Sequence, residues 1–265
     1  MKKSVIEKWY KILNFPKEYT EDFYALLKAT DCEDITDING YADSSDKGKN
    51  LLAYLYFCES VSEKYKKLGI PEEILIDTLY DLVVWTKTYY DMTGKVGFAQ
   101  TGWLKWHMSF KLFKLGRLQF AFDKAECDIE AYSVKRGDDI LAVHIAEVGP
   151  LDIDECLKSF ENAKNFFKKY FPEYNYKCFT CHSWLLDEGL GNYLRENSNI
   201  LRFAALFKNI KADESDALLK YIFRRDATRE NLDDMKIKSS FAQKIYDAVK
   251  CGETFYEVLG ARKIQ

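Results

Sequence analysis

Hydrophobic residues recur at helical spacing through the first part of the chain, every three or four positions along one face. Gly69 and Pro71 supply a stop and a start between two such segments. The polar segment 31–48 and the glycine-containing segment 91–97 interrupt the pattern and predict a surface loop and a turn. The helices that this spacing predicts cover residues 1–30 with a break at Phe15-Pro16, 51–68, 72–90 and 102–115.

At Gly116 the pattern changes to the alternation of a strand, in which Leu118, Phe120 and Phe122 are the apolar positions. A second, apolar strand begins at Ile140 (ILAVHIAEV). A helix follows from Asp152, which can cap it with Glu155 three residues on, and ends at Phe171-Pro172. The next strand is 178–183. A strand, a helix and a strand in this order predict a right-handed crossover with the two strands parallel.

The remaining segments complete a mixed architecture. The elements that their patterns predict are a short helix over 187–194, strands over 199–210 and 219–224, and a last helix over 239–250. We expect an α+β fold in two domains, with a helical domain over 1–116 and a mixed β-sheet domain flanked by helices over 117–265.

Composition narrows the functional classes. The chain has 265 residues, 47% of them hydrophobic and 31% charged, with a net charge of −3. A nucleic-acid-binding domain usually carries a basic surface, so we expect no nucleic-acid partner. No run of 18 apolar residues and no N-terminal signal peptide occur, and the seven cysteines are scattered. We therefore expect no membrane partner, reduced thiols and a cytoplasmic location, and the oligomeric state stays open.

Histidine is the first candidate for chemistry. Two of the three histidines, His144 and His182, lie at corresponding places on the two predicted parallel strands. A cleft between the carboxyl ends of neighbouring strands would bring both imidazoles to its walls, where a neutral imidazole can act as a general base. Glu147 and Ser183 could orient an imidazole or relay its proton. The third histidine, His107, reads as a packing or surface residue.

The segment Cys178 to His182 (CFTCH) matches the haem-attachment pattern and a zinc or redox CxxC pattern. Zinc needs a second ligand pair, and haem attachment of this kind needs export; the sequence supplies neither. Positions i and i+3 of a strand also point to opposite faces, so the two sulfurs could not share a metal. We expect no metal and read Cys178 as a buried strand residue. Cys181 could act as a nucleophile only if its thiol were exposed and its pKa lowered.

The turn Val148-Gly149-Pro150 precedes a helix, the position at which anions often bind. Pro150 donates no N–H, however, and Asp152, Asp154 and Glu155 put negative charge there. Arginines elsewhere in the chain could compensate for this negative charge, although such residues are more often solvated or paired with acidic side chains. The basic residues read in this way are Arg202, Arg224, Arg225 and the helically spaced Lys111, Lys114 and Arg117.

Several segments resemble a bacterial family of acyltransferase-domain proteins. They are LLAYLYFCES (51–60), GIPEEILIDTL (69–79), DLVVWTKTYY (81–90), KLFKLGRLQF (111–120), HIAEVGPL (144–151), FFKKYFPEY (166–174), FTCHSWLLD (179–187) and SNILRF (198–203). This family has a helical N-acyltransferase N-terminal domain and a GNAT-like C-terminal domain. The resemblance implies a GNAT-like α+β fold and transfer of an acyl group from acetyl-CoA or another acyl-CoA.

In a GNAT-like fold, two central parallel strands splay apart and the acyl thioester enters the gap. The resemblance implies that Val148, Gly149 and Leu151 contact the CoA. This chain departs from the family pattern in two places. It has Glu147-Val148-Gly149-Pro150-Leu151 where the family has a glycine-rich loop, and His144-Ile145-Ala146 where relatives often have His-Ile-Pro.

Three functions follow from these observations. The first is an acyl-CoA-dependent N-acyltransferase that acylates a small-molecule amine, with His144 or His182 as the base. The second is a non-catalytic GNAT-like module that binds a small molecule or a protein. The third is acyl transfer or hydrolysis through Cys181. The acyl chain, the acceptor and the pathway are left open by the sequence.

Overall fold

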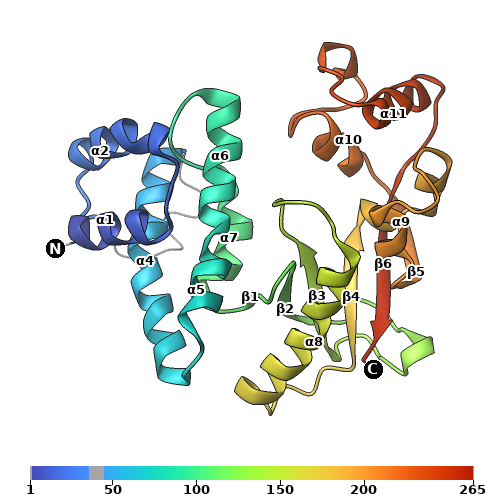
Figure 1. Ribbon diagram of the computed structural model, residues 1–265, viewed down its shortest axis with the longest axis horizontal. Coiled ribbons are helices and arrows are strands. Elements are labelled where there is room, and N and C mark those ends of the chain that lie inside the picture. The colour runs from blue at the N-terminus through green and yellow to red at the C-terminus, as the bar shows by residue number, and fades with distance from the viewer. Residues whose placement is uncertain (1, 36–44, 265) are drawn as a thin grey trace.

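The computed structural model describes residues 2–35 and 45–264, so residues 36–44 of the expected surface loop lie outside the described residues. The N-terminal part is helical, as predicted (Figure 1). Its helices are α1 (Lys2–Ile12), η1 (Lys17–Tyr19, a 3-10 helix), α2 (Thr20–Ala29), α4 (Lys47–Leu68), α5 (Glu72–Leu79), α6 (Asp81–Thr93) and α7 (Thr101–Met108).

Two of the predicted helices differ in extent. The segment 72–90 forms two helices that meet at Tyr80, so Asp81 lies at the start of α6, where the helix dipole favours a negative charge. The helix expected over 102–115 ends at Met108. Phe110 has a φ of 59°, which stops the helix, and the chain continues into strand β1 (Leu112–Lys114). A short apolar run does not distinguish a helix from a strand, which explains this error.

The second half contains a six-stranded sheet in the order β1-β2-β3-β4-β6-β5. Its strands after β1 are β2 (Leu118–Lys124), β3 (Asp139–Ile145), β4 (Cys178–Ser183), β5 (Lys208–Glu214) and β6 (Tyr256–Lys263). Only β3 and β4 are parallel neighbours, and helix α8 (Ile153–Tyr170) connects them. The sheet is therefore mixed and contains the predicted strand–helix–strand unit. A short 3-10 helix, η2 (Glu130–Tyr132), lies between β2 and β3.

Helices cover both faces of this sheet. On one face, Phe160 of α8 packs against Phe120 of β2 and Phe179 of β4, with ring centroids 5.7 and 5.0 Å apart. On the other face, Trp103 and Trp106 of α7 pack against a small buried cluster of Leu112, Ala121 and Ala142. Helix α7 therefore lies against one face of the sheet, and α8 lies against the other.

The segment after β4 corrects two predictions. Residues 199–210, expected as a strand, begin with α9 (Asn199–Ala204), because the side chain of Ser198 accepts a hydrogen bond from the Leu201 N–H and caps the helix. The sheet resumes only at β5, whose residues are mostly exposed. Residues 219–224 lie mainly in helix α10 (Ala217–Ile222) instead of a strand. The short helix expected over 187–194 is present as the 3-10 helix η4 (Glu188–Asn192), and a further 3-10 helix, η3 (Trp184–Leu186), precedes it.

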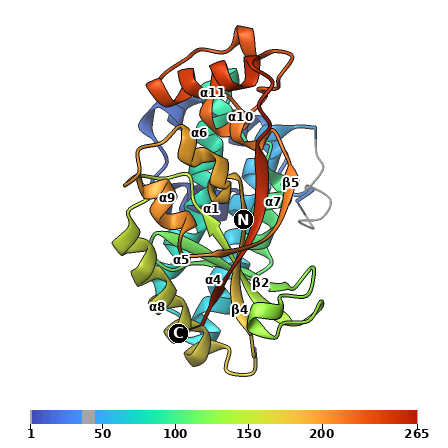
Figure 2. The ribbon, with the colours of Figure 1, turned by 90° about the vertical axis from the view of Figure 1, so that its right-hand side faces the viewer.

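The last helix, α11 (Ser240–Lys250), is confirmed, and Ser239 caps it by accepting from the Ala242 N–H. The 3-10 helix η5 (Leu232–Asp234) precedes it. Helices α10 and α11 lie together beyond one end of the sheet, as both ribbon views show (Figures 1 and 2).

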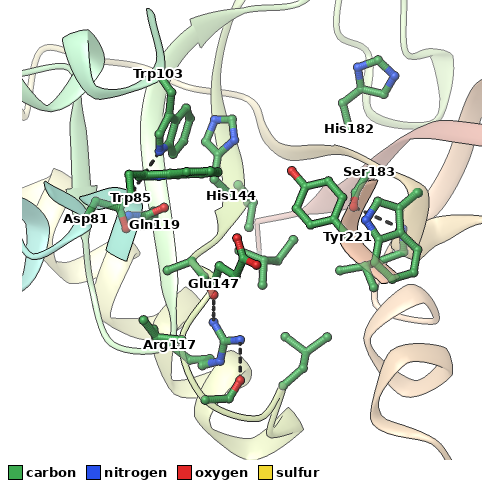
Figure 3. A pocket seen from close by; sticks show the side chains of 18 of the residues that line it. Asp81, Trp85, Trp103, Arg117, Gln119, His144, Glu147, His182, Ser183 and Tyr221 are labelled. Atoms are coloured by element: carbon green, nitrogen blue, oxygen red, sulfur yellow. Dashed lines mark hydrogen bonds between the residues drawn. The ribbon is translucent and has the colours of Figure 1, made fainter. Parts of the chain in front are cut away.

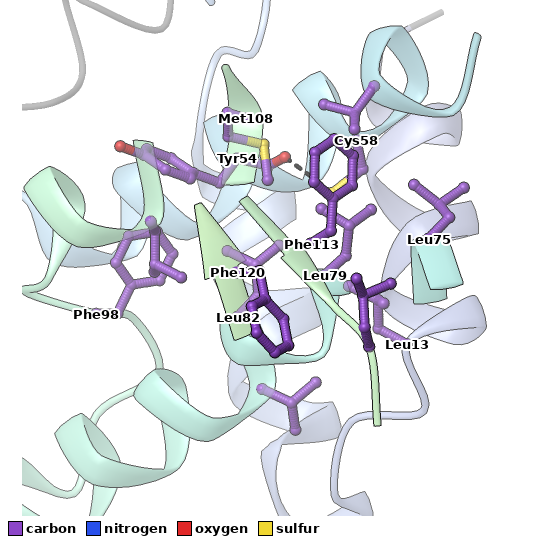
Figure 4. Packing of buried hydrophobic residues seen from close by; sticks show 14 of the residues in the cluster. Leu13, Tyr54, Cys58, Leu75, Leu79, Leu82, Phe98, Met108, Phe113 and Phe120 are labelled. Carbon is purple, nitrogen blue, oxygen red and sulfur yellow. Dashed lines mark hydrogen bonds between the residues drawn. The ribbon is translucent and has the colours of Figure 1, made fainter. Parts of the chain in front are cut away.

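Two hydrophobic clusters hold most of the molecule together. The main core joins the N-terminal helices to the sheet: Phe113 of β1 and Phe120 of β2 lie among Leu79, Leu82 and Met108 of the helices (Figure 4). A separate C-terminal cluster includes Leu218, Leu219, Phe223, Ala227, Leu232, Ala242, Ile245 and Phe255. The N-terminal helices and the sheet therefore share one core, whereas α10 and α11 rest mainly on another.

No helix in the described part of the chain combines the length and the apolar character that a membrane span requires.

Candidate active site

Strands β3 and β4 separate after a short paired stretch. Their register contains only Leu141 opposite Phe179 and Ala142 opposite Thr180. Each strand nevertheless continues, because β3 stays paired with β2 as far as Ile145 and β4 stays paired with β6 as far as Ser183. The two parallel strands therefore diverge toward their carboxyl ends, and His144 and His182 lie beyond their last paired residues.

A cavity of about 690 Å³ opens at this divergence (Figure 3). This volume is within the range of small-molecule and cofactor sites. Its lining comes from α6, α7, β2, β3, the loop after β3, β4, η3, α9, the region of α10 and β6. The residues that line it are Asp81, Trp85, Gln100, Trp103, Arg117, Gln119, Val143, His144, Ile145, Ala146, Glu147, Val148, Gly149, Leu151, His182, Ser183, Trp184, Leu185, Ile200, Tyr221, Arg225 and Glu257.

The cavity brings together most of the candidate residues that the sequence singles out. His144, His182, Glu147 and the CoA-contact candidates Val148, Gly149 and Leu151 all line it. Cys181 does not. It is 1% exposed on the sheet face that packs into the main core, and burial raises the pKa of its thiol to about 12. The two conditions for a nucleophilic Cys181, exposure and a lowered pKa, are not met.

His144 packs against two tryptophans of α7. The ring of Trp103 is 4.8 Å and that of Trp106 is 6.1 Å from the imidazole, both edge-to-face. Burial lowers the pKa of His144 to about 4, with the nearby His107 acting in the same direction. The imidazole is therefore neutral at physiological pH and keeps a ring nitrogen free to accept a proton.

This lowered pKa predicts a pH-dependent stability. Between the ordinary value of 6.5 and about 4, the unfolded chain binds a proton at position 144 that the folded chain does not. The stability present above pH 6.5 is thus lost as pH falls toward 4, by up to about 3 kcal/mol for a shift of this size. Urea denaturation at pH 7 and pH 4.5 should show a smaller loss for His144→Asn than for the wild type. Equal losses would contradict the prediction.

Deep in the cavity lies a polar group of residues that the sequence analysis missed. Asp81 is 4% exposed, and its Oδ2 accepts a hydrogen bond of 2.9 Å from the indole N–H of Trp103. Nε2 of His107, a residue expected to be packing or surface, lies 3.0 Å from the same oxygen. Burial alone would raise the pKa of Asp81, but the contacts with His107, Gln119 and Trp103 outweigh it, and the pKa is lowered. A buried carboxylate therefore stays ionised beside the cavity.

Arg117 corrects the expectation of a solvated side chain. Its guanidinium donates to three backbone carbonyls of the loop after β3: Nη1 to Ala146 at 3.0 Å, Nη2 to Gly149 at 3.4 Å and Nε to Pro150 at 2.8 Å. The backbone N–H of Arg117 donates to the hydroxyl of Ser159 in α8, at 2.8 Å. Arg117 therefore ties the loop to β2 and α8. We call this set of contacts the Arg117 clamp.

The start of α8 confirms the predicted cap. The Asp152 side chain accepts from the N–H groups of Asp154 and Glu155, both at 3.0 Å. Two backbone donors that could bind an anion at this helix start are thus already engaged by a carboxylate.

Arg225 lines the cavity and contacts three separate parts of its wall. Its guanidinium pairs with Glu147 and lies over the rings of Tyr221 and Trp85, 4.0 and 4.8 Å from their centroids. Arg225 thus joins the α10 region, the loop after β3 and the N-terminal helix α6. Arg224, by contrast, pairs with Asp226 away from the cavity lining.

In residues 2–35 and 45–264, no group of three His, Cys, Asp or Glu side chains is placed to hold a metal ion.

Comparison with known families now places the chain. Residues 4–110 match the N-acyltransferase N-terminal domain, and residues 112–261 match the GNAT-like C-terminal domain. The chain belongs to the family that combines these two domains. A search of curated proteins finds no match.

Solved structures of acyltransferases are similar to this family member along almost its whole length. An acyltransferase in complex with decanoyl-CoA and teicoplanin has a TM-score of 0.81 and 23% identity, covering 98% of this chain and 87% of that one. A mutant acyltransferase in complex with octanoyl-CoA gives 0.80 and 23%, with the same coverage. A complex with CoA and 10C-Teicoplanin gives 0.80 and 23%, again over 98% and 87%. At this identity the likeness establishes the fold.

Proposed function

We propose that the protein is an acyl-CoA-dependent N-acyltransferase that moves an acyl group to a small-molecule amine. The observation that carries the proposal is the divergence of β3 and β4 at Ala142 and Thr180, with a 690 Å³ cavity at the opening and a neutral imidazole, His144, on its wall. The acyl-CoA complexes of the similar acyltransferases support the donor class.

In this proposal the thioester enters the gap between the diverging strands. Backbone groups of β3 that face the gap have lost β4 as a partner, so their N–H groups can polarise the thioester carbonyl. The amine nitrogen bonds to the acyl carbon and the carbon–sulfur bond breaks. The nitrogen's proton passes to His144, and CoA leaves as a thiolate that takes up a proton.

The other candidates have narrower roles in this mechanism. His182 is exposed and lines the same cavity, so it is the alternative base. Glu147 pairs with Arg225 on the cavity wall, which gives it a structural role in place of a proton relay. Val148, Gly149 and Leu151 contact the CoA along the loop that the Arg117 clamp holds.

Calorimetry and thermal unfolding with acetyl-CoA, octanoyl-CoA and free CoA test the proposal. A ligand that binds only the folded state and is present at 100 times its dissociation constant raises the free energy of unfolding by about 2.7 kcal/mol. We expect saturable stabilisation, with the preferred chain length indicating the donor class. We also expect release of CoA thiol when an amine is added. Absence of binding by every CoA species would refute the proposal.

A non-catalytic ligand-binding module is the second candidate. It is favoured by the cap at α8, where the Asp152 carboxylate already engages the N–H groups of Asp154 and Glu155 and Pro150 supplies none. This candidate predicts a saturable small-molecule ligand without turnover. Release of CoA thiol in the presence of an amine would eliminate it.

A further inference from the structure

The imidazole of His144 is oriented by packing, because no hydrogen bond fixes its buried ring nitrogen. Its Nε2 atom has no hydrogen-bond partner in residues 2–35 and 45–264. Its two tryptophan neighbours, Trp103 and Trp106, both come from α7, and Trp103 is the nearer, with ring centroids 4.8 Å apart. The orientation of the imidazole therefore depends on what holds Trp103 in place.

Trp103 is held on two sides. Its indole N–H donates to Oδ2 of Asp81 at 2.9 Å, and the ionised carboxylate makes this hydrogen bond a strong one. The ring of His107 packs edge-to-face against the indole, with centroids 5.3 Å apart, and its Nε2 lies 3.0 Å from the same carboxylate oxygen. Asp81 and His107 are both buried, so water competes little for these contacts. The indole is thus fixed both at its N–H and across its ring.

The same carboxylate also reaches another neighbour of His144. Gln119 lies directly opposite His144 on β2, and its side chain hydrogen-bonds to Asp81. Asp81 belongs to α6 in the helical part of the chain, whereas β2 and β3 belong to the sheet. One buried carboxylate from the helices therefore anchors both the aromatic neighbour and the cross-strand neighbour of the imidazole (Figure 3).

We propose that Asp81 is a positioning residue for His144 and that it acts through Trp103. This inference rests on the proposed function, because it concerns the orientation of the base in that reaction. A displacement of about 1 Å can cost about 100-fold in rate, so a base without a hydrogen bond of its own needs a fixed neighbour. The N-terminal helices thereby take part in the chemistry, since they orient a base that the sheet carries.

Steady-state kinetics test this role. Trp103→Phe keeps an aromatic ring but removes the indole N–H, and Asp81→Ala removes its acceptor. Each should lower kcat for acyl transfer by about 10- to 100-fold and leave the affinity for octanoyl-CoA almost unchanged. Asp81→Asn keeps an oxygen that can accept from the indole, so it should recover most of the lost kcat.

Trp9→Phe is the matched control. Trp9 is also a buried tryptophan, and its indole N–H donates to the carboxylate of Glu59 at 2.7 Å. Neither Trp9 nor Glu59 lines the cavity. The variant loses the same kind of hydrogen bond at a place remote from His144, and it should keep the wild-type kcat.

Nuclear magnetic resonance tests the positioning without CoA and without turnover. The chain has three histidines, so isotope-labelled histidine gives few imidazole signals, and His144→Asn assigns the one that matters. We expect the wild type to show a nuclear Overhauser effect between the rings of Trp103 and His144. Asp81→Ala should weaken this effect and Asp81→Asn should preserve it.

The outcomes separate positioning from a merely structural role. Wild-type kcat in Trp103→Phe, or an unchanged contact between the two rings in Asp81→Ala, would overturn the proposal. Equal losses of kcat and of octanoyl-CoA affinity would also overturn it. Thermal unfolding shows whether each variant folds, and Trp103→Phe decides if Asp81→Ala does not. A wild type without turnover would refute the proposed function alone, because the ring contact still tests the positioning.

Discussion

His144→Ala should lower kcat for acyl transfer by about 100- to 10,000-fold, the usual contribution of a positioned general base. The imidazole lies on the cavity wall where β3 leaves β4, and burial keeps it neutral with a pKa of about 4. The affinity for octanoyl-CoA should change little, because the loss falls on proton transfer and not on donor binding. Steady-state release of CoA thiol, with calorimetry for the donor, measures both quantities.

Two variants serve as comparisons for this prediction. His182→Ala removes the other imidazole of the cavity, and a larger loss there than in His144→Ala would move the base to His182. Cys181→Ala removes a buried thiol that does not reach the cavity and should keep wild-type turnover. Wild-type turnover in both histidine variants would refute an imidazole base altogether.

Arg117→Ala should weaken octanoyl-CoA binding by about 10- to 100-fold, because it removes three charge-assisted hydrogen bonds to the loop of Ala146, Gly149 and Pro150. Gly149, with a φ of 61°, lies in this loop, and its carbonyl is one of the three acceptors. Arg117→Lys keeps the charge but not the planar array of donors, so it separates the clamp from electrostatic attraction. Isothermal calorimetry measures the affinity.

The control for the Arg117 clamp is Lys111→Ala, because Lys111 has an exposed side chain and does not line the cavity. It should bind octanoyl-CoA as the wild type does. If Arg117→Lys binds octanoyl-CoA normally while Arg117→Ala does not, the positive charge of residue 117 accounts for the affinity and the hydrogen bonds of the Arg117 clamp do not. Unchanged binding in Arg117→Ala would show that the loop holds its shape without the arginine.

The sequence predicted the central unit of the site well. The apolar run from Ile140, the Asp152 cap and the strand at Cys178 specify a strand–helix–strand unit, and its handedness follows from general rules of chain packing. Because the strands are parallel, His144 and His182 were expected at the same end of the sheet, and both line the cavity. The family resemblance, on quoted segments along most of the chain, is confirmed.

The other parts of the site depend on contacts between distant segments. Asp81 reads as one polar residue in an apolar helix, and Gln119 as a polar position of an alternating strand. Neither pattern reveals that the two lie in one cavity. A buried polar position within an apolar helical stretch was the only available indication. Arg117 was misread because its spacing from Lys111 and Lys114 suits a helix, whereas the chain there forms β1 and a turn at Gly116.

Strand β6 was missed for a different reason. It lies inside the sheet between β4 and β5, yet Gly260 interrupts its apolar stretch and charged residues flank it. The structure explains the glycine: a Cβ at this position would lie 2.7 Å from Cδ1 of Leu186 and 2.9 Å from Cβ of Phe207. Glycine is therefore required by the close packing of η3 and the α9–β5 connection on the strand, which the sequence pattern alone does not reveal.

The two hydrophobic clusters support different parts of the cavity wall. Strand β3 contributes Leu141 and Val143 to the main core, whereas Arg225 lies in the segment between Phe223 and Ala227 of the C-terminal cluster. Repacking the C-terminal cluster can thus shift this arginine of the cavity wall without moving His144. The residence time of a ligand and the rate of its chemical conversion are then set by different parts of the sequence, and selection can adjust one without altering the other.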